Sequence, residues 1–60
     1  MFEKLETILK ERGLSIPFLA KELDMPNSKF YDWRQRGIIP KTADLIAIAD
    51  YLGIEPKELL

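Results

Sequence analysis

Cysteine and histidine are both missing from this 60-residue chain. Without cysteine it can form neither a disulfide nor a thiolate metal site. Without histidine it lacks the side chain that most often binds metals or titrates near neutral pH. No apolar run approaches the ~20 residues that span a bilayer, and the N-terminal MFEKLETILK is amphipathic and acidic, unlike a signal peptide. We therefore expect a cytoplasmic protein without a metal, a cofactor or a membrane partner.

Catalytic patterns are lacking as well. The chain has no glycine-rich phosphate loop and no paired carboxylates in a predicted cleft, and neither Ser15 nor Ser28 has a general-base partner. A chain this short buries only about 60% of its unfolded surface, which leaves little room for a substrate pocket. Residues 1–60 are therefore expected to form one domain that is not an enzyme and takes no small-molecule substrate.

The hydrophobic residues are spaced as in amphipathic helices, and no alternating strand pattern occurs. Ser15 and Thr42 are the expected N-caps, while Gly13, Gly37 and Gly53 are the expected left-handed stops. These signals predict five short helices, over residues 2–12, 16–23, 27–35, 43–52 and from 56 onward.

Two features of the later helices are also expected. Asp44 falls in the first turn of the fourth helix, where a negative charge is favourable. Pro56 suits the first position of the fifth helix, whose Leu59 and Leu60 should face inward.

The segment 16–37, IPFLAKELDMPNSKFYDWRQRG, is the most informative part of the chain. Two helical patterns flank the break Asp24-Met25-Pro26. Ala20, before the break, is small enough for a second helix to cross closely. Phe30 and Trp33, after it, share one helical face and should be buried.

Together with its surroundings, this segment resembles the lambda-repressor-like (Cro-type, xenobiotic-response-element) helix-turn-helix family. The resemblance rests on the Leu-Ala pair, the Trp-Arg-Gln-Arg-Gly ending, the proline-containing loop after it and the closing IADYLGIEPKELL, so it covers nearly the whole chain. It implies a compact all-α, five-helix domain over residues 1–60 with a central helix-turn-helix. It also implies double-stranded DNA as partner, because such a unit places its second helix in the major groove.

Three residues depart from that family's pattern. Asp24 stands where the turn usually has glycine, although Asp is among the few residues that tolerate positive φ. Pro26 stands where a Ser or Thr cap is common. Ile16 replaces a residue that often binds phosphate, and with Phe18 it forms an apolar pair that either packs against the first helix or serves as a partner surface.

A helical wheel of the third helix separates an inner from an outer side. With Phe30 and Trp33 inward, Ser28 and Gln35 point directly outward. Donor and acceptor geometry, together with the resemblance, assigns base contacts to Asn27, Ser28 and Asp32, with Asp32 favouring a cytosine amino group. Lys29 and Tyr31 are candidates for base or backbone contacts, and the candidates for phosphate contacts are Arg34, Gln35, Arg36 and Lys41.

The charge distribution agrees with this assignment. The whole chain has a net charge of −1. Residues 25–41, however, contain four Lys or Arg against one Asp, a net charge of +3. A local positive patch attracts phosphate.

Each assignment has a structural alternative. Asn27 can cap the third helix instead of reading a base. Asp32 can pair with Lys29 or Arg36 along the helix. The four cations can form an ordinary solvated face.

Two hypotheses for function follow. In the first, the protein is a sequence-specific transcriptional regulator. The resemblance points to a phage or mobile-element repressor that binds a palindromic operator as a homodimer, with Tyr51, Ile54 and Leu59–Leu60 as candidate dimer contacts. In the second, it is a helical protein-interaction module, or an antitoxin, without an independent DNA role.

Overall fold

The predicted helical pattern is realised as four α-helices and one turn of 3-10 helix, with no strand. The computed structural model describes residues 1–60. The elements in chain order are α1 (Phe2–Glu11), α2 (Ile16–Glu22), α3 (Asn27–Arg36), α4 (Thr42–Leu52) and η1 (Pro56–Leu59). No helix is long and apolar enough to cross a membrane. The all-α class is thus confirmed, whereas the count of five α-helices is not.

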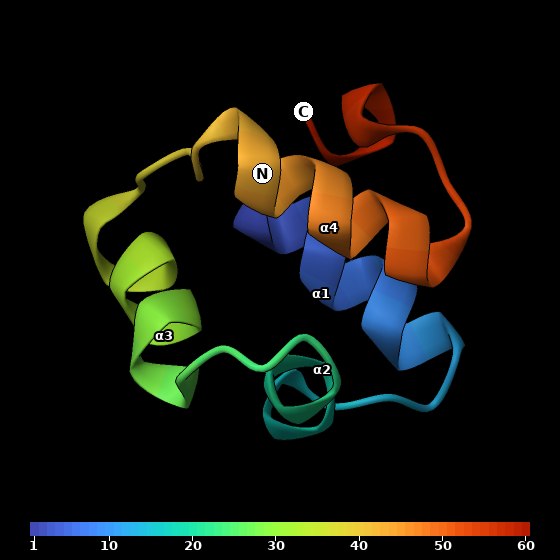
Figure 1. Cartoon of the computed structure of the whole chain (residues 1–60), viewed down its shortest axis with the longest axis horizontal. Coiled ribbons are helices and arrows are strands. Elements are labelled where there is room, and N and C mark those ends of the chain that lie inside the picture. The colour runs from blue at the N-terminus through green and yellow to red at the C-terminus, as the bar shows by residue number, and fades with distance from the viewer.

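One hydrophobic cluster joins all five elements. In Figure 1, α4 passes in front of α1, α2 lies below them and is seen almost end-on, and α3 forms the left side of the molecule. Each fully buried aliphatic or aromatic side chain stabilises the fold by about 1.5–3 kcal/mol. The cluster contains 12 buried residues: Phe2, Leu5, Leu9, Leu19, Ala20, Phe30, Trp33, Leu45, Ile48, Ala49, Leu52 and Leu59.

All four α-helices end in the same way. A residue with positive φ follows each helix: Gly13 (70°), Asp24 (56°), Gly37 (63°) and Gly53 (70°). The next residue then donates its backbone N–H to a carbonyl five positions back, as in Met25 to Ala20 at 2.8 Å. This is the Schellman stop, which satisfies carbonyls that the helix end would leave free. The three predicted glycine stops are confirmed, and Asp24 plays the same part at the end of α2.

The small residue Ala20 lies in α2, shortly before the turn that leads to α3. Ala20 is buried, and α2 packs against α3. The predicted N-cap of α2 is confirmed, because the Ser15 hydroxyl accepts a 3.2 Å hydrogen bond from the backbone N–H of Phe18. A capped start and a Schellman stop fix both ends of this short helix, and so fix where α3 begins.

The predicted Thr42 cap is wrong. The N-cap of α4 is Lys41, no side chain caps this helix, and Thr42 is already its first residue. Pro40 is buried just before this point. Lys41 itself has an extended backbone (φ −64°, ψ 159°), so the chain turns helical only after it.

The C-terminal element also differs from prediction. η1 is closed by short-range bonds, from Glu58 N–H to the Glu55 carbonyl (2.9 Å) and from Leu60 N–H to the Lys57 carbonyl (3.2 Å). A capping box, in which the Glu58 carboxylate accepts from the Glu55 N–H at 2.8 Å, holds its start. Leu59 is fully buried as expected, but Leu60 is 56% exposed, so its predicted inward position is wrong. Consecutive residues of a tight helix point 120° apart, and only one of the two can face the core.

A side-chain bond connects α4 to α2. The Tyr51 hydroxyl donates to Glu22 Oε1 at 3.2 Å. Loss of surrounding water, followed by the hydrogen bond to Glu22 and its charge, raises the pKa of Tyr51 above the ordinary 10.0. This bond ties the helix-turn-helix to the C-terminal half of the chain.

The Asp24 conformation gives a test of the turn. Left-handed backbone costs a non-glycine residue about 1–2 kcal/mol, while glycine loses about 0.5–1 kcal/mol of extra chain entropy on folding. We expect Asp24→Gly to raise the free energy of unfolding by up to about 1 kcal/mol and Asp24→Ala to lower it, in urea denaturation. If Asp24→Gly and Asp24→Ala lowered the free energy of unfolding equally, this prediction would be wrong, because the Asp24 carboxylate would then be the stabilising group.

Candidate nucleic-acid interface

The inner side of α3 is anchored by two aromatic residues. Phe30 is fully buried and Trp33 is 6% exposed. Their ring centroids lie 4.8 Å apart with an interplanar angle of 62°, an edge-to-face arrangement. Such pairs contribute about 0.5–1.5 kcal/mol beyond the area they bury. The predicted inner face is therefore confirmed, and α3 has a fixed rotation about its own axis.

The opposite side of α3 is polar and open to solvent. The five predicted outward or N-terminal residues are all exposed: Asn27, Ser28, Tyr31, Asp32 and Gln35. Tyr31 is the one large apolar ring among them, with 41% of its surface exposed. An α-helix with its side chains is about 10–12 Å across, so a helix of this kind fits a major groove about 12 Å wide.

Asn27 does not cap α3. The N-cap is Pro26, which has an extended backbone and no side chain to bond, and Asn27 is the first helical residue. None of the side-chain hydrogen bonds involves the Asn27 amide. The capping alternative is therefore wrong, and the Asn27 amide keeps its donors and acceptor for another partner.

Lys29 lies on the flank of α3 that faces α4. Its ammonium Nζ is 3.0 Å from Asp44 Oδ2, and the two side chains are 34% and 11% exposed. The sequence predicts Asp44 only as a favourable charge in the first turn of α4, and no spacing in it indicates Lys29 as a partner. Two residues 15 positions apart meet here because α3 and α4 are joined by a short loop.

Asp32 and Arg36 form a looser pair. Arg36 Nε lies 3.8 Å from Asp32 Oδ1, and the side chains are 70% and 63% exposed. Exposed pairs one helical turn apart contribute only about 0.3–0.5 kcal/mol. Asp32 therefore pairs with Arg36, which is one of its two predicted partners. The other predicted partner, Lys29, pairs with Asp44 instead. The weakness of the pair leaves both groups free to exchange it for other contacts.

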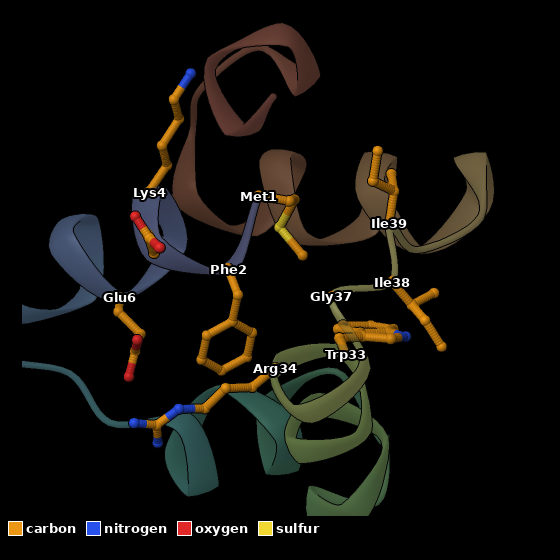
Figure 2. Close-up of a pocket in the computed structure, with 10 residues that line it drawn as sticks. Met1, Phe2, Lys4, Glu6, Trp33, Arg34, Gly37, Ile38 and Ile39 are labelled. Atoms are coloured by element: carbon orange, nitrogen blue, oxygen red, sulfur yellow. The ribbon is translucent and has the colours of Figure 1, made fainter.

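Arg34 occupies the other flank of α3. It lines a groove of about 590 Å³ between the start of α1 and the end of α3, together with Met1, Phe2, Glu3, Lys4, Glu6, Trp33, Gly37, Ile38 and Ile39. Figure 2 shows the Arg34 side chain extended along this groove, with its guanidinium on the side of Glu6, while the Trp33 ring lies close to Ile38. Arg34 is therefore exposed beside acidic residues of α1.

The remaining predicted cation, Lys41, is exposed at the start of α4. The loop before it presents Ile38 and Ile39, which are 42% and 62% exposed. In the apolar pair at α2, Ile16 packs against the core while Phe18 is 42% exposed. The packing alternative therefore holds for Ile16 and not for Phe18.

Comparison with known families identifies this architecture. The family model described as the Cro/C1-type HTH DNA-binding domain matches residues 4–60. The chain therefore belongs to the Cro/C1-type helix-turn-helix family, which confirms the resemblance seen in the sequence. No curated protein and no solved structure matches the chain. The family is one of DNA-binding domains of transcription regulators rather than of enzymes, and α3 is the second helix of the motif.

The free Asn27 amide gives a test of its role. Removing a side chain without partners changes stability little, so we expect Asn27→Ala to alter the free energy of unfolding by less than about 0.5 kcal/mol. Ser15→Ala is the matched control, because it removes an observed cap and should cost about 1 kcal/mol. Thermal unfolding followed by circular dichroism measures both. A loss at Asn27 as large as that at Ser15 would restore the capping role.

Proposed function

We propose that residues 1–60 act as a single domain that reads a specific DNA sequence with the outer face of α3. The observation that carries this proposal is the two-sided character of the helix. Phe30 and Trp33 fix one side in the core, while polar side chains on the other side are exposed and free of strong partners. A rigid helix with an open polar face is what direct readout in the major groove requires.

The proposed base contacts are Asn27, Ser28 and Asp32. The Asn27 amide matches the N6 and N7 atoms of adenine, and the Ser28 hydroxyl can donate or accept. Asp32 can only accept, so it selects a cytosine amino group once its weak pair with Arg36 opens. Tyr31 lies beside them, with its ring available to a thymine methyl or the sugar-phosphate backbone.

The proposed phosphate contacts lie around this face: Arg34, Gln35, Arg36 and Lys41. Lys41 at the start of α4 and Arg36 at the end of α3 are both exposed cations close to the loop between these helices. The acidic remainder of the chain limits binding to DNA in other orientations.

We further propose that the protein is a repressor of the phage or mobile-element kind, which acts in a bacterial cytoplasm by blocking polymerase at an operator. One α3 covers only a few base pairs, so high affinity calls for a homodimer on a palindromic site, with half-sites about one helical turn apart. Of the candidate dimer contacts, Leu59 is buried within the core and unavailable, whereas Leu60, Tyr51 and part of Ile54 are accessible.

Selection of duplexes from a random pool, followed by footprinting, tests this proposal. We expect an enriched palindrome and an affinity that falls steeply with salt. Asn27→Ala or Ser28→Ala should change the preferred sequence by about 1–3 kcal/mol for each lost contact. Arg34→Ala or Lys41→Ala should weaken all sequences alike and reduce the slope of log K against log salt by about 0.9.

The same selection can contradict the proposal. Recovery of no enriched sequence, with weak binding that salt does not change, would favour a protein-interaction module. Enrichment without a palindrome would leave DNA reading intact and remove the homodimer.

A further inference from the structure

The ion pair between Lys29 and Asp44 differs from every other charge contact in the protein. Asp44 is the one charged residue that is buried, at 8% exposure. Its bond to Lys29 is 3.0 Å long, whereas the two other ion pairs measure 3.6 and 3.8 Å between side chains at least 63% exposed. Partial burial reduces solvent screening, so removal of Lys29 would leave the Asp44 carboxylate without a partner in a site with little water.

The pair also lies where few other contacts join α3 to α4. The helix packs mainly against α2, while α4 packs mainly against η1. The loop between α3 and α4 is exposed from Gly37 to Ile39. Lys29 is one residue from Ser28 and three from Asp32, so its bond to Asp44 restrains the part of α3 that carries the proposed base contacts.

We propose that Lys29 is a positioning residue for DNA reading, and that it holds α3 against α4 through Asp44 instead of contacting DNA itself. This inference rests on the proposed function, since it assigns a role within the same interface. If Lys29 turned to a phosphate, the buried Asp44 carboxylate would lose its partner. That carboxylate would then face the negatively charged DNA without a neutralising cation. Both effects oppose that movement.

The test compares Lys29 with Arg36, a matched cation seven residues and about two turns further along the same flank of α3. Lys29→Met and Arg36→Met each remove one positive charge and keep an unbranched side chain. Lys29→Arg restores the charge, and Asp44→Asn removes the negative charge of the partner with no change in size. For each folded variant, we would measure affinity for the selected duplex and for a scrambled duplex over a range of salt concentrations.

We expect Lys29→Met to lower the ratio of specific to non-specific affinity by about tenfold, with the salt slope of non-specific binding unchanged. Lys29→Arg should retain the ratio. Arg36→Met should show the reverse pattern, a slope smaller by about 0.9 and an unchanged ratio. Asp44→Asn should lower the ratio even though it makes the protein less negative. Asp44→Asn keeps an oxygen acceptor beside Lys29, so we expect this variant to fold even if Lys29→Met does not.

Two other outcomes overturn the inference, and they are distinguishable. If Lys29→Met behaves like Arg36→Met while Asp44→Asn tightens binding to both duplexes, Lys29 is a phosphate contact, and the proposed function stands without this role. If the unaltered protein binds the selected and scrambled duplexes equally, the proposed function fails and the positioning role fails with it.

Discussion

Burial of Phe30 and Trp33 decides which side of α3 faces solvent. The edge-to-face pair occupies the inner side of α3 and leaves the helix one rotation in which both rings are out of water. Any other rotation would expose about 150–250 Å² of aromatic surface for each ring turned outward. The position of every outer residue, from Asn27 to Gln35, follows from this burial. The orientation of the proposed DNA-reading face is therefore set by the core, although none of its exposed side chains belongs to the core.

The helix ends determine how this anchored helix is presented. Four Schellman stops turn the chain sharply after α1, α2, α3 and α4, so short connections suffice between helices. At the α2–α3 junction, the Ser15 cap and the Asp24 stop define the two ends of α2, whose Ala20 is buried in the core. The charges are then divided between two tasks. Lys29 is engaged with Asp44 inside the fold, while Arg36 and Lys41 are exposed beside the outer face.

The sequence predicted local features well, because they depend on neighbouring residues. The spacing of Phe30 and Trp33 gave the buried face of α3, and Ser15 and the glycines gave helix ends that the structure confirms. Two predictions are wrong because they consider a residue's type without its neighbours: Thr42 does not cap α4, and Leu60 does not face inward with Leu59. The Lys29–Asp44 bond was missed for a different reason. It depends on the angle between two helices, and no periodicity within one helix contains that information.

Whether the outer face of α3 reads DNA can be tested by nuclear magnetic resonance, in a titration of the isotopically labelled protein with its selected duplex. We expect the largest shifts at the backbone amides of Asn27, Ser28 and Asp32 and at the side-chain amides of Asn27 and Gln35. The ring resonances of Phe30, which is fully buried, should change little throughout. Shifts confined to η1 or to the surface around Phe18, with the outer face of α3 unchanged, would show that α3 does not read DNA.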